Sequence, residues 1–220
     1  MEHILERPTL RDQIYDILKK SIILREIQPG DKINEEDLAK TLQVSRTPIR
    51  ESLLRLEHEG IVQILPRRGA FVASVSEAKT AEVFQVREVL EGLVARLATM
   101  NMNDEILNRL KICLENATSI QNNDDRLLKY TPADIEFHGL LLEACNNDLL
   151  KSLMQIVNAH LQMVRLRTVV LPGRPEQTVS EHHEIFEAME RRDARSAEKL
   201  MRKHVESVRK DALKDVDPAE

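Results

Sequence analysis

Apolar residues recur every three to four positions over most of the first 60 residues of the chain. The stretch LRDQIYDILKKSIILREI, residues 10–27, has this helical period, and the turn residues of QPGDKI follow it. NEEDLAKTL predicts a second helix of two turns, with Asn34 as its N-cap. SRTPIRESLLRLEHEG predicts a third helix, in which Ser45 caps the first turn, Pro48 is tolerated there and Gly60 ends the helix.

The period of the pattern then changes from about 3.6 to about two. IVQIL and AFVASV are short strand patterns, and the residues PRRG between them predict a hairpin with arginines at its tip. Three short helices followed by a hairpin is the order of elements in a winged helix-turn-helix, a DNA-binding arrangement.

Beyond residue 76 every pattern is helical and none is typical of a strand. We predict helices near residues 77–99, 104–122, 126–145, 148–170, 178–191 and 194–214. Six helices with short connections predict an antiparallel bundle. The expected fold class is therefore mainly α, with a winged helix-turn-helix domain over residues 1–76 and an all-helical domain over residues 77–220.

The distribution of charge also differs between these two regions. The chain has 32 Lys and Arg against 37 Asp and Glu, a net charge of −5. Residues 1–76 hold 12 of each sign, so residues 77–220 hold the remaining 20 basic and 25 acidic residues. A neutral N-terminal domain does not bind nucleic acid by bulk charge. Its affinity for DNA would have to come from a few well-placed arginines and from dimerisation.

Composition narrows the class of protein further. Cys113 and Cys145 are too few and too far apart for a disulfide framework or a paired-cysteine metal site. The N-terminus lacks the apolar run of a signal peptide, and no stretch approaches the length of a membrane span. We therefore expect a cytoplasmic protein that does not bind membranes. Aromatic residues make up 3% of the chain, which argues against platforms that stack single-stranded bases.

The third predicted helix has the chemistry of a DNA reader. Its first two turns carry the polar residues Ser45, Arg46, Thr47 and Arg50. In a helix-turn-helix the first residues of the second helix lie nearest the base edges, and arginine binds guanine or phosphate. The hairpin tip adds Arg68, with Gly69 permitting close approach to the backbone. The alternative is a solvated helix start and an ordinary hairpin.

A second constellation lies in the predicted bundle. ADIEFHGLLLEA places Asp134 and His138 four residues apart, on the helix face that also carries Leu141 and Cys145. A charge in a helical core is unfavourable, so such groups are neutralised, paired or bound to a metal. This pair is therefore a candidate for half of a metal site.

Two more histidines are expected to reach the same point. The last two predicted helices meet near Asp193, and His182 lies 11 residues before it while His204 lies 11 after it. In an antiparallel hairpin these two positions are level. One carboxylate and three imidazoles suit Zn²⁺, Ni²⁺, Mn²⁺ or Fe²⁺, with room for an added ligand. The neighbouring His183 is the rival of His182, and a coincidence of helical register is the alternative to a metal site.

The segment PGDKINEEDLAKTLQVSRTPIRESLLRLEHEGIVQILPRRGAFV resembles the DNA-binding domain of the GntR family of bacterial transcription regulators. The resemblance rests on the PG turn, VSRTPIRE, the EG helix end and the RRG wing. It implies that Ser45, Arg46, Thr47 and Arg50 contact DNA, with Gly69 at the wing. One position departs from the pattern of some relatives, which carry an arginine where this chain has Glu36.

Residues 77–214 resemble the FCD ligand-binding domain, the effector module of FadR-type GntR regulators, in its shorter six-helix, VanR-like form. An Asp-x3-His pair, EH-x-x-I and a late histidine match the family pattern, which implies metal ligation by Asp134, His138, His182 and His204. VFQVREVLEG resembles the first helix of the family's bundle, which implies that Arg87 points into an effector pocket.

The alternative for Arg87 is a surface ion pair with Glu91. Arg165 and Arg167 are weaker candidates for the same pocket.

Together these patterns predict a homodimeric transcription regulator. Its N-terminal domains would bind near-palindromic double-stranded operator DNA, and its bundle would bind a divalent metal and, through it, a small organic acid that modulates operator binding. The alternatives are that the metal itself is the signal or is purely structural. A metal-dependent hydrolase with a DNA-targeting domain is a remote alternative, because the sequence indicates no additional buried Glu or His that could act as a general base.

Overall fold

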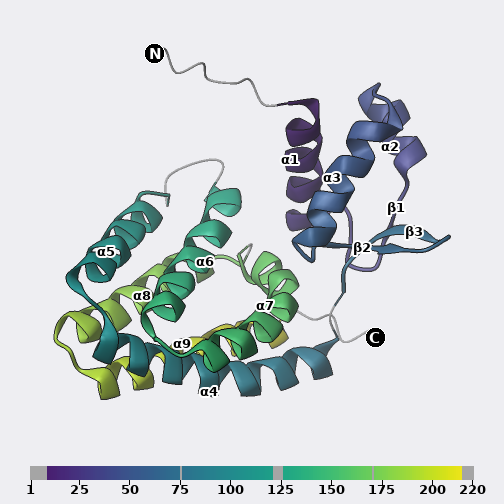
Figure 1. Cartoon of the computed structure of the whole chain (residues 1–220). Helices are drawn as coiled ribbons and strands as arrows, with labels where there is room; N and C mark the ends of the chain where they lie inside the picture. The colour runs from purple at the N-terminus through teal and green to yellow at the C-terminus, as the bar shows by residue number, and fades with distance from the viewer. Residues whose placement is uncertain (1–8, 75, 121–125, 170, 215–220) are drawn as a thin grey trace, which may run out of the picture. The chain divides into compact units, whose positions relative to one another are not determined.

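The computed structural model of the chain describes residues 9–74, 76–120, 126–169 and 171–214 (Figure 1). It divides into two compact units, Met1–Ser74 and Val75–Glu220. Helices dominate both units, and the only strands among the described residues form a small sheet in the first. The mainly α fold class predicted from the sequence is therefore confirmed.

The N-terminal unit is a winged helix-turn-helix. Its elements are α1 (Leu10–Ile23), β1 (Lys32–Ile33), α2 (Glu35–Leu42), α3 (Arg46–His58), β2 (Val62–Leu65) and β3 (Gly69–Val72). The strands form one antiparallel sheet in the order β1-β3-β2, and Leu65 pairs with Gly69 where the hairpin turns. The side chain of Asn34 caps α2 by accepting from the backbone N–H of Glu36, as predicted.

Three details of this unit differ from the sequence-based expectations. α1 ends at Ile23 rather than residue 27, because the chain leaves the helix at Leu24 and Arg25 adopts a φ of 58°. β1 was not predicted, since a two-residue strand has no period to read. Ser45 stands at the N-cap position of α3, but its side chain makes no capping hydrogen bond. The hydroxyl of Ser45 is thus not used to cap the helix.

The apolar faces of α1 and α3 pack together and hold α3 in place. Leu18 of α1 and Ile49, Leu53 and Leu56 of α3 are fully buried there. Arg46, Thr47 and Arg50 project from the exposed side of the same helix. One face of α3 is therefore an anchor, and its first two turns present polar side chains to solvent.

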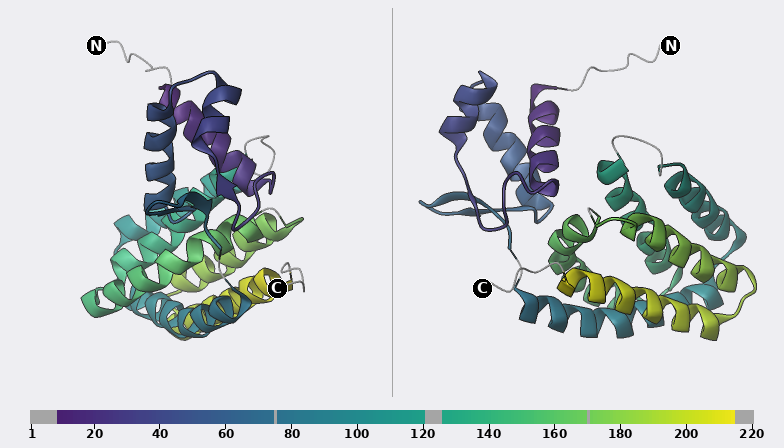
Figure 2. Two further views of the ribbon diagram at one scale, coloured as in Figure 1. Left: turned by 90° about the vertical axis from the view of Figure 1, so that its right-hand side faces the viewer. Right: turned by 180° about the vertical axis from the view of Figure 1, so that it is seen from behind.

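The second unit is an all-helical bundle. Its helices are α4 (Glu77–Asn101), α5 (Asp104–Ser119), α6 (Arg126–Ala144), α7 (Asp148–Thr168), α8 (Arg174–Glu190) and α9 (Ala194–Lys214). α9 runs along α4, which is its most extensive contact (Figures 1 and 2). Fully buried Phe84, Leu110, Leu141 and Leu161 form part of one core that is contributed by α4 to α9.

α8 begins four residues earlier than predicted. Gly173 adopts a φ of 76° just before the helix, and Pro175 lies in its first turn. A proline is tolerated there because its missing N–H would have had no partner within the helix. Among the described residues, no helix combines the length and the apolar character needed to cross a membrane.

α4 and α9 approach each other closely at Gly92. A Cβ at this position would lie 2.8 Å from Cγ of Arg202, and the guanidinium of Arg202 is held by Glu198 at 2.9 Å. A Cβ at Gly139 of α6 would meet nothing within 4 Å. The two helical glycines thus form a matched pair that differs in packing.

We expect Gly139→Ala to raise the free energy of unfolding by about 1 kcal/mol, because alanine favours the helix more than glycine does. Gly92→Ala should lose that gain through overlap with Arg202, and should be neutral or destabilising by about 1 kcal/mol. Urea unfolding followed by circular dichroism measures both variants. Equal stabilisation by both would show that α4 and α9 do not pack tightly at Gly92.

Candidate functional site

The four side chains predicted as metal ligands converge inside the bundle. Asp134 and His138 come from α6, His182 from α8 and His204 from α9, and one potential ligand atom of each lies within 4.8 Å of the others. Nε2 of His182 is 3.4 Å from Nε2 of His204. Oδ1 of Asp134 is 3.7 Å from Nε2 of His138 and 3.9 Å from Nε2 of His182. We call these four residues the Asp–His cluster.

His182 rather than His183 belongs to the cluster. The ring of His182 is buried and stacks on Phe137, with 4.0 Å between the ring centroids. His183 is only partly buried, and its Nε2 lies 3.2 Å from the hydroxyl of Thr118. The structure thus separates the two adjacent histidines that the sequence left as rivals.

Two glutamates orient the imidazoles of the cluster. Nδ1 of His138 donates to Oε2 of Glu91 at 3.0 Å, and Nδ1 of His204 donates to Oε2 of Glu181 at 2.7 Å. Because an ionised carboxylate only accepts hydrogen bonds, each Nδ1 carries the proton and each Nε2 lone pair faces the cluster, where Nη2 of Arg87 also lies 3.4 Å from Nε2 of His138. Arg174, itself buried, donates to Glu181 at 2.7 Å and fixes that carboxylate.

The carboxylates around the cluster are ionised at neutral pH. Burial opposes ionisation of Glu91, but His138 and Arg87 outweigh it and lower its pKa to about 2. For Glu181, burial is again outweighed, here by hydrogen bonds from His204 and Arg174, and the pKa is also about 2. Each carboxylate is therefore a ready acceptor for its histidine.

The pKa of Asp134 also lies well below its usual range. Burial again opposes ionisation, and the nearby His138 and Arg165 outweigh it. Burial lowers the pKa of both His182 and His204, and for His182 the neighbouring His204 and His138 lower it further. A metal requires an ionised carboxylate and neutral imidazoles, and these are the forms that the interior favours for Asp134, His182 and His204. The donor set therefore fits a divalent transition metal or zinc.

Glu91 corrects one expectation from the sequence. No additional buried glutamate was expected in the bundle, yet Glu91 is 1% exposed and contacts His138 directly. The ion pair between Arg87 and Glu91 does form, with Nε 3.3 Å from Oε1, but it is buried and is not the surface pair considered as an alternative. Spacing showed that the two residues share a helix face, and it did not show which way that face points.

A cavity of about 230 Å³ adjoins the cluster between α4, α6 and α7. Its wall is formed by Glu91, Val94, Ile135, His138, Gly139, Leu142, Met154, Asn158 and Arg165. A smaller cavity of about 50 Å³ lies near Asp134, where Arg174 and several threonines form part of its wall. Arg165 borders both cavities, and its Nε donates to Oδ2 of Asp134 at 2.9 Å. The side chain of Arg167 lies outside the described part of the structure.

The predicted DNA contacts are on the surface of the N-terminal unit. Ser45, Arg46, Thr47 and Arg50 are exposed at the start of α3. Arg68 is exposed where the β2–β3 hairpin turns, and Gly69 has a φ of 99°, a conformation that favours glycine. The start of α3 and the hairpin thus present the polar residues that the sequence singled out.

Comparison with known proteins matches both units to families. Residues 10–72 match the family described as bacterial regulatory proteins, gntR family, and residues 82–207 match the FCD domain. YdhC of Bacillus subtilis (strain 168), an HTH-type transcriptional regulator, is 31% identical over 201 residues, which cover 91% of this chain and 90% of YdhC. The HTH-type transcriptional repressor RspR of Escherichia coli (strain K12) is 28% identical over 199 residues, 90% of this chain and 87% of RspR.

Solved structures of similar proteins have the same fold. A GntR transcriptional regulator from Rhodococcus sp. RHA1 superposes with a TM-score of 0.63 at 24% identity, covering 94% of this chain and 99% of its own. McbR/YncC of E. coli gives a TM-score of 0.62 at 20% identity, covering 90% of this chain and 94% of its own. These structural similarities support the two-unit fold. At these sequence identities they carry no information on what the Asp–His cluster binds.

The adjacent histidines provide a controlled test of the cluster. We expect His182→Ala to lower the Zn²⁺ retained after dialysis well below that of the wild type, because it removes one of the three imidazoles available to the ion. His183→Ala should retain the metal, since His183 lies outside the cluster. Elemental analysis of the two variants and the wild type measures this. Equal metal contents in all three proteins would show that His182 is not a ligand.

Proposed function

We propose that this chain, which belongs to the GntR family of bacterial transcription regulators and carries an FCD domain, senses a small carboxylate through a divalent metal. The chain is a DNA-binding transcriptional regulator, and the relatives named above are regulators rather than enzymes. The observation that carries the proposal is the Asp–His cluster, four donor groups within 4.8 Å beside a cavity of about 230 Å³.

In this proposal Asp134, His138, His182 and His204 hold the metal. Zn²⁺, Ni²⁺, Mn²⁺ and Fe²⁺ all accept one carboxylate and three imidazoles. Such an ion supplies a Lewis-acidic point of attachment for the carboxylate of an effector. Glu91 and Glu181 keep two of the imidazoles in the orientation that directs Nε2 toward the ion.

The charges around the larger cavity support a small organic acid as the effector. Arg165 lines the cavity, and Nη2 of Arg87 lies 3.4 Å from Nε2 of His138 at the edge of the cluster. Arginine binds carboxylates through paired hydrogen bonds, so a carboxylate near the metal would meet cationic partners. A cavity of about 230 Å³ is smaller than a typical drug-binding pocket, which favours a compact ligand.

α4 connects this site to the DNA-binding unit along the chain. It contributes Arg87 and Glu91 to the site, and its first residue, Glu77, follows the last residue of β3, Val72, after a short connection. An effector that favours one arrangement of α4 would therefore shift the population of DNA-binding states. Such coupling is reciprocal, so operator DNA would change effector affinity by the same factor.

The proposal assigns DNA contact to the start of α3 and to the hairpin. The residues concerned are Ser45, Arg46, Thr47, Arg50, Arg68 and Gly69. Arginines at the start of a reading helix suit base-edge and phosphate contacts. Two copies of the unit would read the two halves of a near-palindromic operator.

A second copy of the chain is also the proposed partner of an apolar surface on the bundle. Val86 and Met100 of α4 are 51% and 64% exposed, and Leu149 and Ile156 of the adjacent α7 are 72% and 63% exposed. Exposed apolar side chains on two neighbouring helices favour an interface between proteins. A homodimer would cover them and would place two reading heads on one operator.

The effector is tested by the melting temperature of the purified protein. We expect a member of a panel of small carboxylates to raise the melting temperature of the Zn²⁺-loaded protein by about 5 °C or more at saturating concentration. The same compound should leave the chelated protein unchanged. Arg165→Gln should weaken the response because it removes a cation from the cavity wall, whereas Arg109→Gln, on the exposed side of α5, should retain it.

Two results would contradict this effector. A carboxylate that stabilises loaded and chelated proteins equally would show that it does not bind through the metal. Stabilisation by Zn²⁺ with no response to any carboxylate would favour the alternative in which the metal itself is the signal or a structural element.

A further inference from the structure

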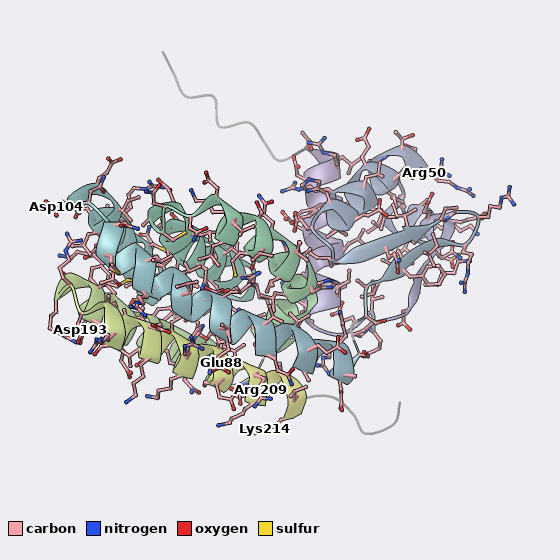
Figure 3. All side chains as sticks on the ribbon, turned by 60° about the horizontal axis from the view of Figure 1, so that its bottom comes forward. Arg50, Glu88, Asp104, Asp193, Arg209 and Lys214 are labelled. Atoms are coloured by element: carbon pink, nitrogen blue, oxygen red, sulfur yellow. The ribbon has the colours of Figure 1, made fainter. Side chains whose placement is uncertain are left out.

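Both arginines proposed to contact DNA from the start of α3 are held by glutamates of α2. Nε of Arg50 donates to Oε2 of Glu35 at 2.6 Å. Nη2 of Arg46 lies 3.0 Å from Oε2 of Glu36. Arg50 is labelled in Figure 3, where its unit's side chains are drawn. The two pairs therefore neutralise the side chains on which DNA affinity is expected to depend.

The charges at the N-terminal ends of α2 and α3 explain why the two ion pairs form. The first turn of α2 carries Glu35, Glu36 and Asp37, which suit the positive end of a helix dipole. The first turn of α3 contains no acidic residue and begins with Arg46. The glutamates of α2 therefore supply the negative charge that the start of α3 lacks.

Stability alone does not account for these pairs. The side chains of Arg46 and Arg50 are 52% and 63% exposed, and that of Glu36 is 55% exposed. Exposed ion pairs contribute little to folding, because water and salt screen them. The pairs matter more for which groups of DNA the two arginines can bind.

Each glutamate contacts a different kind of nitrogen on its own arginine. Glu35, only 27% exposed, contacts Nε of Arg50, and the described residues give the two terminal nitrogens of Arg50 no other ion pair. A pair of adjacent donor nitrogens is what guanine needs at O6 and N7. Glu36 instead contacts a terminal nitrogen of Arg46, which is the part that a phosphate would otherwise bind.

We propose that Glu35 supports the sequence specificity of DNA binding and that Glu36 limits its sequence-independent, phosphate-driven affinity. Glu35 is a positioning residue that holds Arg50 through Nε and leaves its two terminal nitrogens available to a guanine. Glu36 competes with DNA phosphates for Arg46 and so weakens binding to unrelated sequences. This inference rests on the proposed contacts of Arg46 and Arg50 with DNA.

The balance of charge in the N-terminal region agrees with this role. Residues 1–76 hold 12 basic and 12 acidic residues, so the region has no general excess of positive charge. Binding to unrelated DNA comes from phosphate contacts, and each contact contributes about −0.9 to the slope of log K against log salt. A glutamate that occupies Arg46 removes part of one such contact.

The test uses the full-length protein and two labelled duplexes. One is the preferred site obtained by selection from a randomised duplex library, and the other is a scrambled duplex of the same composition. Fluorescence anisotropy gives Kd for both over a range of salt concentrations. Glu51→Ala is the matched control, because Glu51 is exposed beside Arg50 and the described residues show no ion pair for it.

Removing Glu36 should strengthen non-specific binding. We expect Glu36→Ala to tighten binding to the scrambled duplex roughly threefold to tenfold relative to Glu51→Ala, and to steepen the salt dependence by about one phosphate contact. If Glu36→Ala and Glu51→Ala bind the scrambled duplex alike at every salt concentration, the competition proposed for Glu36 is wrong.

Removing Glu35 should instead reduce discrimination. We expect Glu35→Ala to lower the ratio of scrambled Kd to preferred Kd roughly tenfold, the discrimination that a good guanine contact provides. Glu35→Gln should recover part of this ratio, since its amide oxygen still accepts from Nε of Arg50. A ratio equal to that of Glu51→Ala would overturn the positioning role.

Two further variants distinguish a failure of this inference from a failure of the proposed DNA contacts on which it rests. Arg50→Ala should abolish preference for the selected site, and Arg46→Ala should weaken binding to both duplexes alike, while both variants melt at nearly the wild-type temperature. If Arg50→Ala keeps the wild-type preference, the proposed DNA contact itself is wrong. If Arg50→Ala loses the preference while Glu35→Ala matches Glu51→Ala, only the role of Glu35 is wrong.

Discussion

An ionised carboxylate inside a helical bundle must have cationic or hydrogen-bonding partners, and Asp134 meets this requirement from both sides. One oxygen faces the imidazoles of His138 and His182, and the other accepts from Arg165. The surrounding helices supply these partners. α6 supplies the carboxylate, α7 supplies Arg165, and the α8–α9 hairpin brings two histidines to the same level. Phe137 completes the arrangement by stacking on His182.

A second layer of carboxylates connects the cluster to the rest of the bundle. Glu91 links His138 to α4, and Glu181 links His204 to Arg174. Such outer partners fix the orientation of the imidazoles and therefore the strength of any metal site. Glu91 belongs to the helix that follows the DNA-binding unit in the chain, so α4 contributes directly to the candidate site. The proposed transmission from effector to DNA depends on this contact.

Periodicity and spacing predicted the winged helix, the six-helix bundle and the four members of the Asp–His cluster. His182 and His204 could be matched because equal distances from a turn place residues level in a hairpin. Glu91 was missed because spacing shows which residues share a face, whereas the neighbour of that face depends on tertiary packing. The pairing of Arg46 with Glu36 was missed for a similar reason, since it joins two helices across a turn. The strand β1 was too short to have a period.

X-ray absorption spectroscopy of the Zn²⁺-loaded protein would test most directly whether the cluster is a metal site. The spectrum reports the atoms bound to the ion without any mutation. We predict a first shell containing three imidazole nitrogens together with carboxylate oxygen, and a change in that shell when a stabilising carboxylate is added. A shell of oxygen atoms alone, without imidazole scattering, would show that the ion binds elsewhere and that the buried cluster is only a structural feature of the bundle.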